Sequence, residues 1–217
     1  IPVDMQTRLS VDTRQIFSVL SHFLSLDQLR QVHLEVHVFD SPNRFKRFKQ
    51  QIAPSLSNNV SGFYSPNLNL VAINRQSNDE TTLAIARHEA AHVIVSGLFG
   101  NIPTWFTEGV AEYFEQMSIS GQLKIIGVNR SWMKLLTEQQ RAGQLMTITE
   151  YLQYDRQSWR DQDQNTMYAT AWSIVHFLMS SRQGKRLMTQ YMDALVADRC
   201  QGINSQAFFN RWYRAIS

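Results

Sequence analysis

Apolar residues recur along the chain with two different periods, and the changes of period outline an order of helices and strands. Residues 11–31 carry apolar side chains at helical spacing and predict an amphipathic helix. Residues 33–39 alternate with period two and predict a half-buried strand. Ser41-Pro42 then predicts a helix that runs to about Gln51, with Ser41 as its N-cap.

The central part of the chain predicts a hairpin followed by a buried helix. Residues 58–64 and 68–74 flank the turn signal Ser65-Pro66-Asn67. The capping-box pattern Ser77-Asn78-Asp79-Glu80 then predicts the start of a helix that extends to about Leu98. This helix is apolar nearly all round, which is typical of a central, buried element.

Within this predicted helix lies the pattern His88-Glu89-x-x-His92. Residues four apart lie one turn apart on the same helix face, so the two imidazoles can reach one metal ion. Glu89 follows His88 by roughly 100° around the helix, which suits a base that accepts a proton from water at the metal. A buried helix with two hydrogen-bonded histidines is the alternative.

A second helix can supply a third ligand. Gly97 and Gly100 favour a chain reversal, and Pro103 prevents the first helix from continuing. Residues 105–114 then read as a helix that can turn back and present Glu108. Two histidines and a carboxylate, with a fourth position open to water, form the ligand set of a catalytic zinc site.

Glu112 lies four residues after Glu108, on the same face of this second helix. We expect it to accept the ring N–H of a ligand histidine and to fix its tautomer. A surface carboxylate near the helix end is the alternative.

These residues carry a resemblance to a known group. His88-Glu89-x-x-His92 followed by Trp105-x-x-Glu108-Gly109-x-Ala111-Glu112-Tyr113 resembles the gluzincin metallopeptidases, above all their small bacterial peptidase-MA-like families. The segment is similar also to the catalytic core of the aminopeptidase N and leukotriene A4 hydrolase family. The resemblance covers roughly residues 60–190. It implies a zincin-like fold with one zinc ion, for which Glu89 is the general base.

The resemblance continues downstream. The segment from Tyr168 to Leu178 resembles a helix of those enzymes whose tyrosine stabilises the transition state, which makes Tyr168 a catalytic candidate. A core aromatic is the alternative for Tyr168. His176, two turns further on, reads as a packed histidine or as a substitute hydrogen-bond donor.

In zincins the strand beside the active-site helix is a sheet edge, and its free backbone groups can bind an extended peptide. The predicted strand within Leu68–Ile73 occupies this place in the sequence. It gives Leu68, Asn69, Leu70 and Val71 as candidate substrate-binding residues, with an ordinary paired strand as the alternative.

The remaining chain reads as helical apart from a polar loop at residues 154–165. We therefore predict an α+β, zincin-like fold, with a small N-terminal mixed sheet and the active-site helix followed by an α-helical lobe. Residues 1–217 are expected to form one gluzincin-like catalytic domain, with an N-terminal lobe of about 1–98 and a C-terminal lobe of about 103–217. The later helices are predicted at residues 131–140, 167–181, 184–198 and 205–216.

Charge and composition argue against other classes of site. The 217-residue chain is 43% apolar, and its net charge is +3. The basic run at residues 44–49 alternates with phenylalanines at helical spacing, which favours a solvated helix face over a nucleic-acid patch. His33 and His37 share a face of the predicted strand but lie about 13 Å apart, too far to chelate one ion.

Cysteine usage and hydropathy bear on the compartment. Cys200 is the single cysteine, so the sequence has neither an intrachain disulfide nor a thiolate metal site. The sequence contains no transmembrane segment, because none of its apolar runs has the length of a membrane span. The chain begins at Ile1, which suits a processed protein. Together with the resemblance, this favours a periplasmic or secreted protein, or one anchored through a removed segment, while a cytoplasmic location stays open.

The leading hypothesis is a zinc metallopeptidase that acts on a peptide or protein substrate, with no nucleic-acid partner. An endopeptidase is favoured because the exopeptidase signature Gly-x-Met-Glu-Asn is absent from the sequence. The alternative is a zinc-stabilised binding or scaffolding module with weak catalysis. Glu89 favours the enzyme, because a purely structural zinc site has no need of a base.

Overall fold

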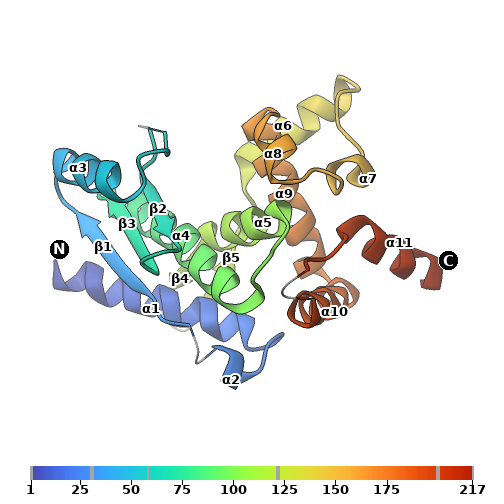
Figure 1. Ribbon diagram of the computed structural model, residues 1–217, viewed down its shortest axis with the longest axis horizontal. Helices are drawn as coiled ribbons and strands as arrows, with labels where there is room; N and C mark the ends of the chain where they lie inside the picture. Colours follow the sequence, from blue (N-terminus) through green and yellow to red (C-terminus); the bar gives the residue numbers. More distant parts are fainter. Residues whose placement is uncertain (1, 30–31, 58, 121–122, 199–200, 217) are drawn as a thin grey trace. The chain divides into compact units, whose positions relative to one another are not determined.

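The computed structural model describes residues 2–29, 32–57, 59–120, 123–198 and 201–216 and has an α+β fold, as predicted (Figure 1). A small mixed sheet lies near the N-terminus and is followed by a mostly helical region. In chain order the elements are α1 (Val3–Leu20), α2 (Leu26–Leu29), β1 (Glu35–Phe39), α3 (Pro42–Ile52), β2 (Gly62–Ser65), β3 (Leu70–Asn74), α4 (Asp79–Phe99), α5 (Thr104–Glu115), β4 (Met117–Ser120), β5 (Leu123–Ile126), α6 (Arg130–Arg141), α7 (Ile148–Tyr151), α8 (Arg156–Arg160), α9 (Gln164–Ser180), α10 (Arg182–Ala197) and α11 (Ser205–Ile216).

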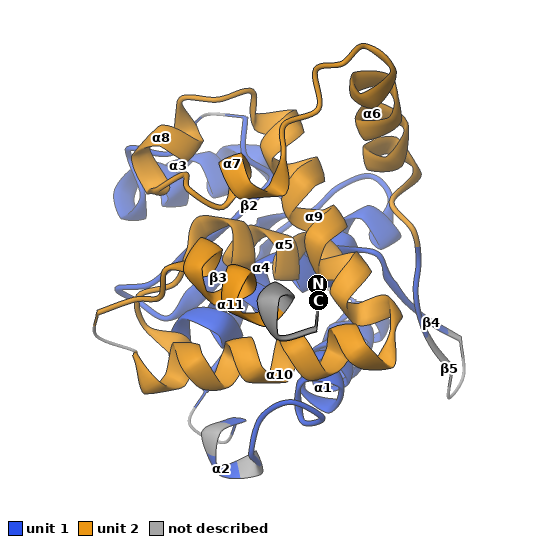
Figure 2. Ribbon diagram, turned by 90° about the vertical axis from the view of Figure 1, so that its right-hand side faces the viewer, with its two compact units in different colours: residues 1–98, 114–127 blue, residues 99–113, 128–217 orange. Residues whose placement is uncertain are grey.

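The chain divides into two compact units, which Figure 2 colours separately. Unit 1 comprises residues 1–98 and 114–127 and contains the sheet, whereas unit 2 comprises residues 99–113 and 128–217 and is helical. Helix α5 continues across the division, so its last two residues, Phe114 and Glu115, belong to unit 1. Cys200 lies outside the described residues.

The sheet of unit 1 has the strand order β1-β3-β2, in which β3 is parallel to β1 and antiparallel to β2. Because side chains alternate along a strand, β3 contributes to two separate apolar clusters. One lies against α3 and the other against α4. The first cluster comprises Phe45, Phe63, Leu70 and Ala72, and the second comprises Val71, Ile73, Ala86 and Val93.

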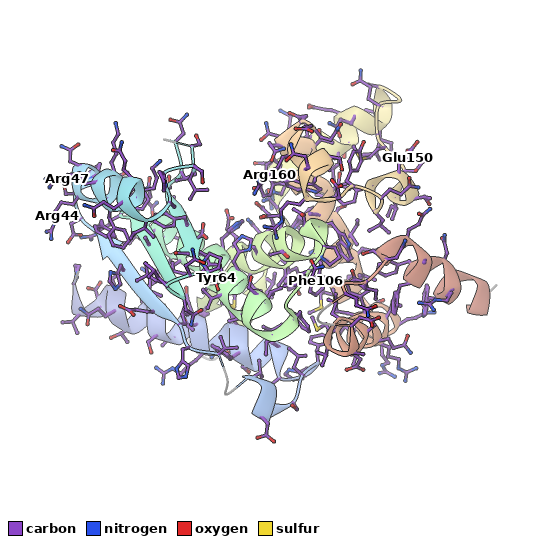
Figure 3. The ribbon with its side chains drawn as sticks, viewed as in Figure 1. Arg44, Arg47, Tyr64, Phe106, Glu150 and Arg160 are labelled. Atoms are coloured by element: carbon purple, nitrogen blue, oxygen red, sulfur yellow. The ribbon has the colours of Figure 1, made fainter. Side chains whose placement is uncertain are left out.

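Helix α3 confirms the predicted amphipathic pattern with one exception. Arg44 and Arg47 are exposed and point away from the sheet (Figure 3), whereas Phe45 is buried. Lys49 is buried instead of solvated, and its Nζ donates to the carbonyl oxygen of Leu56 at 2.8 Å. The basic run is therefore a helix surface with one structural lysine.

The N-terminal helix differs from its prediction. We expected a helix over residues 11–31, but α1 spans Val3–Leu20 and the chain turns after Ser21. Its buried face begins at Met5 and also includes Asp12, a carboxylate in an apolar stripe. Residues 3–10 are mostly polar, which is why the pattern of apolar positions placed the helix too late.

Unit 2 is built around α9, a helix buried along most of its length. Helix α5 approaches it closely at Gly109, where an added Cβ would lie 2.6 Å from the carbonyl oxygen of Ala171. The predicted loop at residues 154–165 contains α8, whose Trp159 is buried. Among the described helices, none combines the length and the apolar character needed to cross a membrane.

Candidate metal centre

Helix α4 presents His88 and His92 one turn apart, as predicted from their spacing. Their rings lie 4.9 Å apart at an angle of 73°, and the two Nε2 atoms are separated by 3.2 Å. Two nitrogens bound to one tetrahedral zinc ion at the usual distances would lie roughly 3.3 Å apart. The imidazole pair therefore already has the spacing of a chelate.

The start of α4 is fixed differently from the predicted capping box. Asn78, not Ser77, caps the helix, since its Oδ1 accepts the backbone N–H of Glu80 at 2.7 Å. The Glu80 carboxylate instead binds Arg8 and Arg87, through contacts of 2.6 and 2.8 Å. Two arginines, one of them 72 residues away, therefore bind the carboxylate that the local pattern assigned to the cap.

The other ring nitrogen of His88 is held by a residue that the sequence did not indicate. Its Nδ1 lies 3.0 Å from Oε2 of Glu115, in the last turn of α5. A carboxylate accepts hydrogen bonds, so this contact favours the tautomer with the proton on Nδ1 and the lone pair on Nε2. That is the tautomer a metal ligand requires at Nε2.

The same helix carries two further carboxylates along this face. Glu108, Glu112 and Glu115 are separated by four and three residues, so they lie one turn after another on α5. One ligand atom from each of His88, His92 and Glu108 lies within 4.8 Å of the others, and this group could hold a metal ion. His88, Glu112 and Glu115 form an overlapping group by the same criterion.

Glu112 is buried, and its Oε2 accepts a hydrogen bond of 2.7 Å from Nε1 of Trp132 on α6. We predicted that Glu112 would bind a ligand histidine. In the structure, His88 makes a hydrogen bond of this kind with Glu115, one turn later on α5. Glu112 binds Trp132 on α6. The helical spacing of the three carboxylates is the signal that could have added Glu115 to the candidates.

Glu89 lies on the side of α4 that faces strand β2. An added Cβ at Gly62 would lie 3.2 Å from Cγ of Glu89 and 2.6 Å from Cγ2 of Ile85. Only glycine leaves room for this packing of the helix on the strand. The half-buried Glu89 side chain is thereby placed beside β2, next to the histidine pair.

Tyr168 is half-buried near the start of α9, where its ring meets Trp159 edge to face at 5.1 Å. Trp159 also donates from Nε1 to the hydroxyl of Tyr151 at 3.2 Å, and that hydroxyl lies 2.8 Å from the carbonyl oxygen of Met167. Burial, with a smaller contribution from the negative charge of Glu108, raises the pKa of Tyr151. Trp159 therefore contacts both Tyr168 and Tyr151, and the charge of Glu108 contributes to the raised pKa of Tyr151.

His176 is a packed histidine, the first of its two predicted roles. Its ring stacks on Trp172 with centroids 4.9 Å apart and an interplanar angle of 22°. Its Nδ1 is buried and has no hydrogen-bond partner among the described residues. Burial lowers the pKa of His176, which favours the neutral ring.

The predicted peptide-binding edge is wrong. We expected Leu68–Ile73 at the sheet edge, but β3 is the central strand and pairs with β1 and β2. Leu68 and Asn69 precede the strand, whereas the backbone of Leu70 and Val71 is paired on both sides. Four consecutive buried residues are typical of such a central strand, so the apolar run at residues 70–73 already favoured the alternative.

Comparison with known families places the metal cluster in its context. A family model described as a protein of unknown function (DUF1570) matches residues 82–197, more than half of the 217-residue chain. The chain belongs to DUF1570. A comparison with curated proteins gives no match. The DUF1570 segment begins inside α4 and ends with α10, so it contains the three candidate ligands but neither α1 nor the three-stranded sheet.

Proposed function

We propose that this DUF1570 protein is a zinc-dependent metallopeptidase, with an endopeptidase as the favoured form. The observation that carries the proposal is the pair of Nε2 atoms 3.2 Å apart on α4, in one cluster with Glu108 and directly beside Glu89. A structural metal site uses its ligands alone, whereas this cluster has a further carboxylate next to it.

The donor set fits one zinc ion per chain. His88, His92 and Glu108 offer two imidazole nitrogens and a carboxylate oxygen, the set typical of catalytic zinc in peptidases. Because Glu115 binds Nδ1 of His88, the lone pair of Nε2 is directed to the metal as a ligand. When bound, zinc acts as a Lewis acid and lowers the pKa of water to about 7.

Glu89 is the proposed general base. Its carboxylate accepts a proton from the attacking water and later delivers it to the leaving amine, so that the proton is returned as the peptide bond breaks. Its place beside β2 supports this role, since Glu89 then flanks the histidine pair and is not one of the candidate ligands.

Tyr168 is the proposed donor to the carbonyl oxygen as negative charge develops there. Its packing on Trp159, which also binds Tyr151 near Glu108, supports this role. Glu112 is proposed to place a second carboxylate near His88, and the hydrogen bond from Trp132 holds that carboxylate in position.

For the peptide or protein substrate we propose the free edge of β2 in place of β3. In the described part of the chain, β2 pairs with β3 alone. The backbone N–H of Asn74 donates to the carbonyl oxygen of Ser61. In an antiparallel pair, every second residue of a strand hydrogen-bonds to the partner strand. Since Ser61 bonds to the β3 side, the backbone groups of Gly62 and Tyr64 are directed to the opposite, free edge of β2. An extended peptide can pair there, beside Glu89.

The decisive test is Glu89→Gln in the zinc-loaded protein, assayed against a peptide library. We expect zinc content to stay at one ion per chain and turnover to fall by about 10² or more, because the side chain keeps its size but loses its basicity. Glu138→Gln, on the exposed surface of α6, is the matched control. Zinc binding without any cleavage by wild type would favour the binding module instead.

A further inference from the structure

Two contacts in unit 1 hold Glu115 in place beside the candidate ligand His88. The first is the 3.0 Å contact between Nδ1 of His88 and Oε2 of Glu115, whose side chains are 16% and 31% exposed. The second is the 3.2 Å hydrogen bond from Nη2 of Arg87 to the carbonyl oxygen of Glu115. The first contact fixes the histidine ring, and the second fixes the backbone that carries the carboxylate.

We propose that Glu115 is the positioning residue of the metal centre, and that Arg87 and Asp12 extend its support to helix α1. The proposal rests on the metal-binding part of the proposed function, not on peptide cleavage. Glu115 holds His88 in the tautomer and orientation that direct Nε2 toward His92. Glu115 thereby acts through His88 and is not itself a ligand.

Arg87 is the centre of the supporting network. Its guanidinium is 5% exposed and lies between α1, the start of α4 and the end of α5. Nη1 binds Asp12 at 2.7 Å, and Nη2 binds Glu80 at 2.8 Å besides the Glu115 carbonyl. Arg87 immediately precedes His88 in the sequence. Arg87 holds the end of α5 through the Glu115 carbonyl, and α5 in turn orients His88 through the Glu115 carboxylate.

Stability alone is a weak explanation for this network. A buried ion pair often contributes little net free energy, because the loss of hydration offsets the attraction. Here burial raises the pKa of Asp12 even though Arg87 opposes that shift. The network is therefore a costly way to stabilise a fold but a suitable way to fix one geometry.

The chain contains a matched control for the histidine contact. Glu35 and His37 form a second pair, with Oε1 and Nε2 2.5 Å apart, but these side chains are 66% and 42% exposed and lie on β1. Glu35→Gln therefore replaces the same type of carboxylate partner at a position outside both candidate metal groups. Asp79→Asn is the matched control for Asp12→Asn, since Asp79 also binds an arginine, Arg75, but has no connection to α5 in the described residues.

The experiment uses the full chain and measures zinc affinity by chelator competition, zinc stoichiometry, the melting temperature of the metal-free protein, and the His88 tautomer by ¹⁵N NMR. We expect Glu115→Gln and Glu115→Ala to weaken zinc binding about 10- to 100-fold, and Glu115→Ala to mix the two tautomers. Asp12→Asn should weaken it several-fold. Glu35→Gln and Asp79→Asn should leave zinc affinity within twofold of wild type.

Three results would overturn the proposal. Wild-type zinc affinity in both Glu115 variants, with a lower melting temperature, would give Glu115 a purely structural role. Two zinc ions per chain in wild type and one in Glu115→Gln would make Glu115 a ligand of a second ion, in the group with His88 and Glu112. Unchanged affinity in Asp12→Asn would remove α1 from the network. Because none of these readouts uses cleavage, a protein without peptidase activity leaves the proposal standing.

Discussion

The chain contains two pairs of histidines with the same spacing, and among the described residues only one pair belongs to a group that could hold a metal ion. His37 lies on β1 and His33 precedes that strand, and four residues of extended chain span about 13 Å. His88 and His92 lie on α4, where four residues make one turn and the Nε2 atoms come within 3.2 Å. Spacing in the sequence therefore gains chemical meaning only through the backbone conformation.

The surroundings of the two pairs differ as much as their geometry. His33 is exposed, and His37 stacks on Phe48 while its Nε2 meets Glu35 at the surface. His88 has its carboxylate partner on another helix and is largely shielded from water. A carboxylate in contact with a histidine therefore does not by itself indicate a metal site. The other ring nitrogen of that histidine must also face a second potential metal ligand.

The largest expected effect breaks this comparison directly. Single replacements His88→Ala and His92→Ala should each weaken zinc binding by more than the roughly 10- to 100-fold that loss of an outer partner causes. The double variant His33→Ala/His37→Ala should bind zinc as wild type does. Chelator competition with elemental analysis measures both. Equal losses in the two sets would show that the metal binds elsewhere.

The sequence predicted the local part of this arrangement well. The helical period around His88 and the Ser41 N-cap of α3 both depend on neighbouring residues, and both are confirmed. The parts that could not be predicted depend on contacts distant in sequence. The place of β3 in the sheet is set by β1, which lies more than 30 residues away.

The carboxylates of α5 show the same limit at a single site. Glu108, Glu112 and Glu115 share one helix face, so periodicity alone cannot say which of them meets His88. In the structure Arg87 binds the backbone carbonyl of Glu115 and the carboxylate of Asp12, and these contacts span 28 and 75 residues of sequence. Helix α8 was missed for a different reason, because its capping pair Asp155 and Ser158 was read as part of a polar loop.

A second comparison concerns Tyr168 and His176, two candidate donors on the same helix. Tyr168→Phe should lower kcat about 10²-fold with little change in KM, zinc content or melting temperature, because its hydroxyl is proposed to act in the transition state. Tyr154→Phe, in the nearby loop of unit 2, is the control. A kcat within a few-fold of wild type would make Tyr168 a core aromatic and require another donor.

The smallest expected effect concerns His176 and is a change in the pH dependence of stability. Burial lowers the pKa of His176 below its ordinary value of 6.5, so the folded state resists protonation. As the pH falls through 6.5, the unfolded chain takes up a proton that the folded protein does not, and this shifts the equilibrium toward unfolding. The loss of stability is complete once the pH falls below the folded-state pKa.

His176→Phe should therefore remove part of this acid sensitivity while its ring keeps the stacking on Trp172. The measurement is urea unfolding of wild type and variant between pH 5 and 8, with chelator present so that metal release makes no contribution. The exposed His22, replaced in the same way, is the control. Parallel curves for wild type and His176→Phe would assign the acid sensitivity to other groups. A difference in unfolding free energy that grows below pH 6.5 would show that His176 is buried as a neutral, packed ring. It would thereby distinguish His176 from His88 and His92, which are proposed to bind a metal.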